Sequence, residues 1–317
     1  MAFSRPDYGR DLAAFEPGSP ELDDACAWLA DAADRAPESL PMLPQGARDA
    51  LRLSFDPAAS FDQVADAIQS DPALAAVTLK KANNFVFSRR CRSLADSLAH
   101  LGMQGVREVV LTAGTMRILR APRDPEIGQW LRRRAEAAAH AAAVIELVCG
   151  SERGEAYTVG LLHDIGWMYA YGIIAKHRKS ARPALFSDSR KTRVVVRRCH
   201  TELGARVVTQ WGLPAPVADA VAAHHASDGS AGGIAAATVR AALETLDSLR
   251  VYPEGEGFEV TALAQLGLSG DAIAAVPAAV FGTLKRQRLV QDRRAKRLRS
   301  GGADRERRHI KGLEPVE

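Results

Sequence analysis

The sequence predicts an all-α protein, and three features of its composition support that class. Alanine, the residue with the highest helix propensity, occurs in runs such as residues 137–139 and 141–143. Alternating β-branched and aromatic residues, which are typical of strands, are scarce, and aromatic residues make up only 6% of the chain. Apolar residues account for 47% of the 317 residues, so we expect a sizeable helical core.

The first half of the chain predicts short helices separated by clear turn signals. Residues 1–18 form a loosely patterned leader, and Ser19-Pro20-Glu21 is a helix start, because a hydroxyl cap, a proline and an acid all favour the first turn. Pro41 and Pro44 break that helix. Apolar residues at helical spacing and capping residues then predict helices over residues 47–53, 61–68, 72–82 and 93–101, the last ending at Gly102.

The second half predicts longer helices in the same manner. We expect helices over residues 106–119, 130–149, 155–171, 194–211, 214–225, 234–249 and 271–299, the last capped by Ser269. Residues 176–192 are polar and rich in Lys and Arg, which predicts a connecting segment on the surface. Residues 228–233 predict a flexible turn, and no internal repeat or heptad series is evident.

The cysteines and the termini predict a protein of the cytoplasm. Cys26, Cys91, Cys149 and Cys199 lie at wide, irregular spacings that fit neither a zinc ribbon nor a disulfide framework, so we expect reduced thiols. The first residues lack the charged and apolar regions of a signal peptide. No segment has the apolar length that spans a bilayer.

The net charge of +4 conceals a strongly basic segment near the C-terminus. Residues 285–311 contain twelve Lys and Arg against three acids, a net charge of +9, which leaves −5 for the rest of the chain. Such a segment predicts contact with an anionic partner, either nucleic acid phosphates, an acidic protein or anionic lipid. A solvated extension is an equal alternative, since no aromatic residue is interleaved for base stacking.

The segment that bears most directly on chemistry is Gly160-Leu161-Leu162-His163-Asp164-Ile165-Gly166. Adjacent His and Asp side chains can place an imidazole nitrogen and a carboxylate oxygen on one divalent metal ion. Further histidines follow at His200, His224 and His225. The alternative is structural: a buried His-Asp pair can hydrogen-bond and fix helix packing, and histidines at a helix end interact favourably with its dipole.

Several ordered motifs together resemble the HDOD domain over roughly residues 36–280. The N-terminal ones are Leu40-Pro41-x-Leu43-Pro44, Ser70-Asp71-Pro72-Ala73-Leu74, Lys81-Ala82-Asn83-Asn84 and Ser93-Leu94-x-x-Ser97-Leu98-x-x-Leu101-Gly102. The His163-Asp164 segment matches the centre, and His200-x-x-x-Gly204, Trp211-Gly212-Leu213-Pro214 and Ala223-His224-His225 match the second half. The resemblance implies an all-helical bacterial regulatory module, related to the HD superfamily of metal-dependent phosphohydrolases but mostly without hydrolase activity.

The resemblance also implies a ligand set for a divalent ion such as Mg, Mn, Fe or Zn: His163, Asp164, His200, His224 and His225. Phosphodiesterase relatives carry a further histidine about thirty residues before the His-Asp pair, and that position falls here near Arg134, a cation that would repel a metal. His140 lies nearly two turns later on the same helix and should face elsewhere. Trp167 stands where the relatives have a lysine, and neither Glu244 nor Asp247 matches their distal Asp. We therefore expect no bound cofactor.

These observations lead to one domain scheme and three functional hypotheses. The scheme has a leader and helix at 1–35, an HDOD domain at 36–280 with subdomains 36–122 and 123–280, and a basic helix and tail at 281–317. The first hypothesis is a non-catalytic bacterial signal-transduction module that binds a signalling protein or a ligand in the groove between the two subdomains. The alternatives are a metal-dependent phosphohydrolase acting on cyclic dinucleotides or nucleotides, and a nucleic-acid-associated regulator that uses the basic tail.

Overall fold

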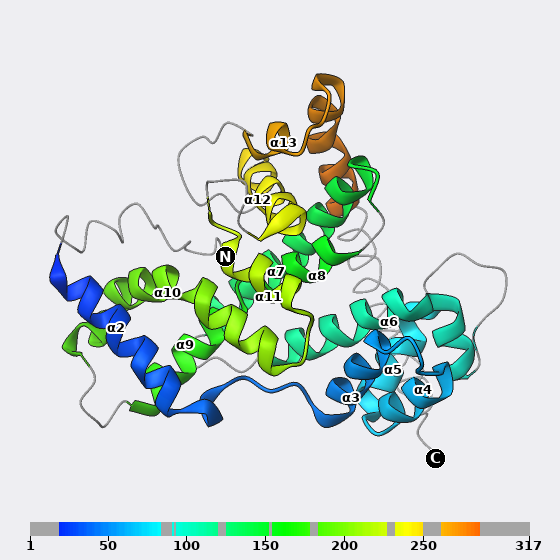
Figure 1. Cartoon of the computed structure of the whole chain (residues 1–317), viewed down its shortest axis with the longest axis horizontal. Coiled ribbons are helices and arrows are strands. Elements are labelled where there is room, and N and C mark those ends of the chain that lie inside the picture. Colours follow the sequence, from blue (N-terminus) through cyan, green and yellow to red (C-terminus); the bar gives the residue numbers. More distant parts are fainter. Residues whose placement is uncertain are drawn as a thin grey trace, which may run out of the picture.

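The computed structural model describes residues 19–83, 91, 93–119, 125–151, 154–177, 183–226, 232–249 and 261–285. Within these ranges every regular element is helical and none is a strand, which confirms the predicted fold class (Figure 1). None of the helices in this described part of the chain has the length and apolar character needed to cross a membrane.

The N-terminal group of helices surrounds one long helix. After α2 (Pro20–Arg35) and the short turn η1 (Pro37–Ser39), helices α3 (Gln45–Phe55), α4 (Phe61–Gln69) and α5 (Pro72–Ala82) pack against α6 (Leu94–Ile118) (Figure 1). The predicted caps are confirmed: the Ser19 hydroxyl accepts a hydrogen bond from the backbone of Glu21, and the Asp71 carboxylate accepts from the backbone amides of Ala73 and Leu74 in the first turn of α5. Gly102, the predicted helix stop, has φ +66° and kinks α6, a conformation that glycine adopts without strain.

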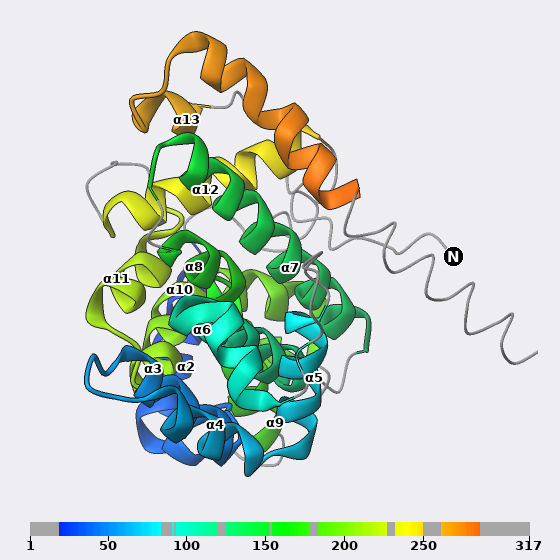
Figure 2. The same cartoon turned by 90° about the vertical axis from the view of Figure 1, so that its right-hand side faces the viewer.

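A second group of helices forms the rest of the core. Helix α7 (Pro125–Val148) packs on α8 (Glu155–Leu162) and α12 (Gly233–Ser248), while α10 (Ser189–Gln210) packs on α9 (Ile165–Lys176) and α11 (Ala215–Ala223). Helix α2 lies outside this group, against α9 and α10 (Figure 1). The short α13 (Thr261–Gln265) and a last helix over residues 270–285 follow α12, and Figure 2 shows both at one end of the molecule.

Two sequence predictions need correction. The expected helix over residues 155–171 is two helices, α8 and α9, with His163 and Asp164 at their junction. The expected surface segment over residues 176–192 includes the buried side chains of Leu185 and Phe186 in a short helical turn, and α10 already begins at Ser189. Its start is early because the Asp188 carboxylate accepts hydrogen bonds from the backbone amides of Arg190 and Lys191.

Other predictions fall largely outside the described residues. Ser269 caps the last helix as expected, its hydroxyl accepting from the amide of Ala272, but the continuation from residue 286 to 299 lies outside them. The expected turn at 228–233 lies mostly outside them too, as does the subdomain boundary between residues 122 and 123. The domain scheme therefore stays a prediction.

The closest approach between helices that matters for the site is at Gly166, where α9 crosses α10. A Cβ atom at this position would overlap the backbone carbonyl oxygen of His200 and lie 2.6 Å from the amide nitrogen of Gly204. Both of these neighbours are backbone atoms, which cannot rotate away. Glycine at residue 166 therefore fixes how closely the His163-Asp164 junction approaches His200.

We predict that Gly166→Ala lowers the free energy of unfolding by about 1–3 kcal/mol, because the new methyl group forces α9 and α10 apart. Chemical denaturation with urea measures this loss. Gly172→Ala is the matched control on the same helix, since its Cβ would meet one carbonyl oxygen, that of Ser39, at 3.4 Å. A Gly166→Ala protein as stable as the control would contradict the proposed role of this contact.

Candidate functional site

The junction between α8 and α9 directs a histidine and an aspartate into the core. His163 follows the last residue of α8 with helical backbone angles, and Asp164 precedes the first residue of α9. The Asp164 carboxylate makes no capping bond to its own helix. Both residues are buried, His163 completely, so their polar atoms depend on partners from other helices.

Arg134 of α7 is the main partner of this pair. Its Nε lies 2.6 Å from Asp164 Oδ2 and 3.2 Å from His163 Nε2. The ion pair is inside the protein, since the two side chains are only 3% and 5% exposed. The guanidinium group lies over the ring of Trp130, with its carbon 5.4 Å from the ring centroid. The sequence predicted that the cation of Arg134 would repel a metal ion at this place. In the structure that cation lies directly beside Asp164.

The remaining predicted histidines meet on the other side of Asp164. His200 Nε2 of α10 lies 3.3 Å from Asp164 Oδ1 and 3.3 Å from Nε2 of His224, which follows α11. The ring of His225 lies 4.2 Å from that of His224 and 5.2 Å from that of His200. The structure thus brings together all five residues that the resemblance singled out, from helices α8 to α11.

Hydrogen bonds to carbonyl oxygens orient three of these rings in the same way. Nδ1 of His163, His200 and His224 each lies within hydrogen-bond distance of the backbone carbonyl oxygen three residues earlier. A carbonyl oxygen only accepts, so each Nδ1 carries the proton, and Nε2 is the atom that faces the cluster. The Nε2 lone pairs of His200 and His224 repel each other at 3.3 Å unless a proton or a cation lies between them.

Burial and charge set the protonation of this cluster. Burial alone would raise the pKa of Asp164, but its close contacts with His163, Arg134 and His200 hold that pKa well below its usual value. Burial, followed by the neighbouring histidines, lowers the pKa of His224. His225 keeps part of its side chain exposed, yet the burial of its ring and the charge of His200 lower its pKa to about 3. The acid is ionised and these two histidines are neutral at pH 7.

The other candidates from the sequence lie elsewhere or take structural roles. His140 faces away from the cluster as expected, with its ring 5.6 Å from that of Tyr157. A Glu244 carboxylate oxygen accepts a hydrogen bond from the backbone of Ala262 at 2.9 Å, and so anchors the start of α13. Trp167, in the position of the relatives' lysine, is buried and forms one wall of the cluster, 5.8 Å from the ring of His200.

The donor set fits at most one of the metal positions that the resemblance implies. Beside His163 and Asp164, the guanidinium of Arg134 holds the carboxylate oxygen that a metal would need. His200, His224 and His225 differ, because one ligand nitrogen from each lies within 4.8 Å of the others. Three imidazoles are a donor set that Zn²⁺ and other transition metals accept. From the sequence we predicted only a repelling role for Arg134. Its place thirty residues before Asp164, where the relatives carry a metal ligand, was the one sign that it contacts the acid directly.

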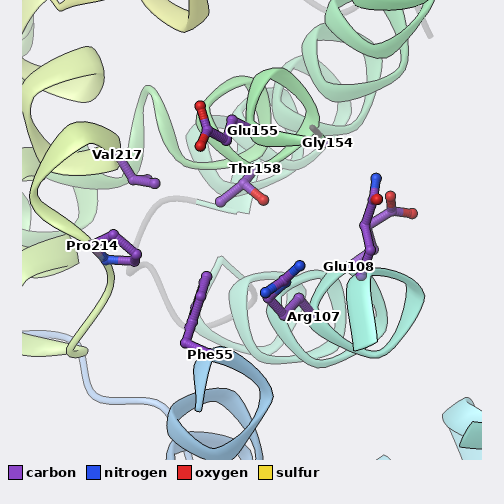
Figure 3. A pocket seen from close by; sticks show the side chains of 9 residues that line it. Phe55, Arg107, Glu108, Gly154, Glu155, Thr158, Pro214 and Val217 are labelled. Carbon is purple, nitrogen blue, oxygen red and sulfur yellow. The ribbon is translucent and has the colours of Figure 1, made fainter. Parts of the chain in front are cut away.

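A cavity of about 220 Å³ lies between the two groups of helices, where α3 and α6 face α8 and α11. Figure 3 shows Arg107, Glu155 and Thr158 facing this opening, with the ring of Phe55 at its side. Arg107 is held in place, because its Nη1 donates to the carbonyl oxygen of Ser54 at 3.1 Å and its guanidinium carbon lies 4.7 Å from the centroid of the Phe55 ring. Burial lowers the pKa of Arg107, and Glu108 and Glu155 partly offset this effect.

The basic segment lies almost entirely outside the described residues. Of residues 285–311, only Lys285 belongs to the described part of the chain. Contact of this segment with nucleic acid, an acidic protein or lipid stays a prediction.

Comparison with known proteins places this arrangement among the HDOD domains. A sequence profile of the HDOD domain matches residues 40–227. A protein of Treponema pallidum without an assigned function is 25% identical over an alignment of 208 positions, which covers 62% of this chain and 39% of that protein. The chain thus matches about two fifths of the length of this relative.

Two solved structures share the fold. One, from Shewanella amazonensis, is named for an expected metal-dependent phosphohydrolase activity. It is 18% identical to this chain with a TM-score of 0.59, and the match covers 83% of this chain and 100% of the Shewanella chain. The other, an HDOD domain protein of unknown function from Geobacter sulfurreducens, is 20% identical with a TM-score of 0.57, over 80% of this chain and 96% of that one. At these identities the likeness shows the fold.

We predict that Arg134→Met lowers the free energy of unfolding by about 3–5 kcal/mol, because it leaves the Asp164 carboxylate buried without its cation. Asp164→Asn should cost a similar amount, and the double variant should lose less than the sum, which a double-mutant cycle in urea measures. Arg117→Met is the control, since Arg117 is 64% exposed in its pair with Asp71 and its loss should cost less than about 1 kcal/mol. Additive losses would contradict the coupling.

We predict that His140 makes stability depend on pH. Burial, followed by the charge of Lys81, lowers its pKa from 6.5 to about 4 in the folded protein. The unfolded chain therefore binds a proton more readily, and this contribution to stability is complete above pH 6.5 and is lost as the pH falls towards 4. The slope should approach about 1.4 kcal/mol per pH unit. Urea unfolding of the wild type and of His140→Gln between pH 7 and 4.5 isolates the contribution of His140. Free energies of unfolding that fall with pH in parallel for the two proteins would refute this prediction.

Proposed function

The chain belongs to the HDOD family, and from that premise we propose that it is a regulatory module that acts by binding a partner or ligand and not by hydrolysis. One observation carries the proposal: the buried ion pair of Arg134 and Asp164, 2.6 Å between Nε and Oδ2. In a metal-dependent hydrolase the acid at this place would bind a metal ion. Here its charge is already balanced by a side chain of the same protein.

The chemistry of arginine makes this arrangement unfavourable for catalysis. A guanidinium remains charged at all physiological pH values, so it cannot release Asp164 by losing a proton. A divalent ion beside it would meet a like charge at short range in a site of low dielectric constant. Without an ion at this place, no group in the cluster is placed to generate hydroxide from water at neutral pH.

We expect the partner or ligand to bind in the cavity between the two groups of helices. The lining of this cavity offers a fixed cation, Arg107, a carboxylate, Glu155, a hydroxyl, Thr158, and the apolar surfaces of Phe55 and Val217. Such a mixture of few polar groups and apolar walls is typical of specific binding sites, and a volume of about 220 Å³ suits a compact ligand or one side chain of a partner. A signalling protein partner, a location in the cytoplasm and an anionic partner for residues 285–311 are further parts of this proposal.

A second candidate function rests on the three histidines. His200, His224 and His225 could hold one divalent ion by their ring nitrogens, and a bound ion would supply an acidic water molecule and a contact for a phosphate oxygen. The side chains would orient this ion through the Nδ1 hydrogen bonds that fix His200 and His224. Phosphohydrolase activity towards cyclic dinucleotides or nucleotides is the corresponding alternative.

Metal content and phosphodiesterase activity distinguish the two candidates. The wild type, Arg134→His and the control Arg133→His are incubated with Mn²⁺, Fe²⁺ or Zn²⁺, desalted, and analysed for bound metal and for hydrolysis of bis(p-nitrophenyl) phosphate and cyclic dinucleotides. Arg133 is the matched control because it lies beside Arg134 on α7 but is exposed. We expect an inactive wild type and control, and a higher metal content in Arg134→His, which removes the cation and adds an imidazole.

Each outcome of this experiment favours one of the two candidate functions. Hydrolysis by the wild type that is lost in Asp164→Asn would overturn the proposed regulatory function and support the second candidate. A wild type that binds one ion without hydrolysis, and loses it in His224→Gln, would leave the regulatory function standing and assign the ion to the histidines.

A further inference from the structure

Two cysteines that are far apart in the sequence meet in the structure. Cys26 lies on α2 and Cys199 on α10, each close in sequence to a partner of the Asp23–Arg198 ion pair that joins the two helices, and each thiol changes the pKa of the other. The sequence spacing predicted isolated reduced thiols, and all four cysteines are indeed free thiols. The other two cysteines lie elsewhere. The backbone amide of Cys91 donates a hydrogen bond to the side chain of Asn83, and Cys149 is the residue that follows α7.

Ion pairs on both sides hold this contact in register. Along the two helices Glu21 pairs with Lys191 at 2.7 Å, Asp23 with Arg198 at 3.2 Å, and Asp34 with Arg206. The residue numbers rise together, so α2 and α10 run in parallel, and the cysteines lie between the second and third of these pairs. The Tyr169 hydroxyl of α9 also donates to the carbonyl oxygen of Ala33 at 3.0 Å. The two sulfurs thus meet through a docked helix pair and not through a chance side-chain conformation.

We propose that Cys26 and Cys199 form an oxidation site for hydroperoxides, which convert the pair into a disulfide bond between α2 and α10. Both side chains are only partly buried, so a small oxidant reaches them. A hydroperoxide is the oxidant class that such a pair takes, because it oxidises a single accessible thiolate without binding a larger protein partner.

The reaction proceeds in two balanced steps. The Cys26 thiolate attacks the outer oxygen of the hydroperoxide; an S–O bond forms, the O–O bond breaks, and the second oxygen leaves as an alcohol, or as water from hydrogen peroxide, after taking a proton. The Cys199 sulfur then attacks the sulfur of the Cys26 sulfenic acid. An S–S bond forms, the S–O bond breaks, and the hydroxyl leaves as water with the thiol proton of Cys199. Two electrons pass from the two sulfurs to the hydroperoxide.

The surroundings of Cys26 favour its role as the attacking group. The neighbouring Cys199 thiol and, after the opposing effect of burial, the charge of Arg198 lower the pKa of the Cys26 thiol. Arg198 is the same residue that pairs with Asp23, so the ion pair that sets the register also places a positive charge near the thiol. Cys199, held against the reacting sulfur, is the resolving residue.

The bond would change how one helix is attached to the core. Helix α2 ends at Arg35 and lies before the residues 40–227 that match the HDOD profile, so the site couples a segment of this chain to the family domain. Cys199 immediately precedes His200 of the candidate site. Oxidation would therefore add a covalent link between α2 and the helix that carries His200. Ion pairs at the protein surface otherwise join these two helices, and the Tyr169 hydrogen bond joins α2 to the neighbouring α9.

The experiment treats the reduced full chain with limiting hydrogen peroxide and measures intact mass, free thiols and disulfide-linked peptides. We expect the loss of two hydrogen atoms, a fall from four free thiols to two, and a linked peptide that contains Cys26 and Cys199. The thermal midpoint of the oxidised protein should rise by an amount on the order of 5 °C, and reduction with dithiothreitol should reverse the rise. Cys149→Ser is the control and should form the same bond.

Three results would overturn the proposal: four free thiols after treatment, a bond that includes Cys91 or Cys149, or a Cys26 sulfinic acid without a disulfide. In Cys199→Ser the sulfenic acid of Cys26 should persist and react with dimedone, whereas Cys26→Ser should not react with dimedone at residue 199. Should either serine variant fail to fold, the comparison of oxidised and reduced wild type still decides the question.

Discussion

The buried ion pair between Arg134 and Asp164 is the constraint on which the rest of the site depends. Moving a guanidinium and a carboxylate out of water costs several kcal/mol for each ion, and only close contact with further hydrogen bonds offsets that cost. The site supplies them: His163 and His200 both contact the same carboxylate, and Trp130 covers the guanidinium. Helix α7 is thereby tied to the junction of α8 and α9, and through His200 to α10. The same residues that could form a metal site act here as a cross-link between four helices.

The precision of this cluster comes from backbone atoms as much as from side chains. Gly166 lets α9 approach the backbone of α10 at His200 and Gly204, which sets the distance between Asp164 and His200. The carbonyl oxygens of residues 160, 197 and 221 then fix the rotation of three imidazole rings. Each of these carbonyl oxygens has two lone pairs, so it can accept a side-chain bond as well as a helix bond. His163 and His224 lie immediately after their helices, whereas His200 lies within α10.

The sequence was sufficient for whatever depends on local chemistry. Ser19, Asp71 and Gly102 act at helix ends as their side chains or backbone freedom predict, and the ordered motifs identified the family and the five residues that converge. It failed where a contact links distant segments. The apolar run through residues 155–171 concealed the break at His163, because both helices are buried on all sides and show no periodic polar face. The pairing of Cys26 with Cys199 is set by how α2 docks on α10, and spacing along the chain holds no information about that docking.

The ion pair of Arg134 with Asp164 limits the places at which a regulatory signal can act on this protein. A histidine or a carboxylate beside Asp164 would exchange protons or metal ions with the solvent, and the cluster would respond to pH or metal concentration. Arginine does neither, and four of the five residues that converge here, all except His225, are buried. A regulatory input must therefore act where helices meet at an accessible surface. The structure offers two such places, the cavity between α6 and α8 and the contact between α2 and α10. Both are connected to the cluster by a single helix, α8 in the first case and α10 in the second, so a change in either contact acts on a residue of the buried site through one rigid element.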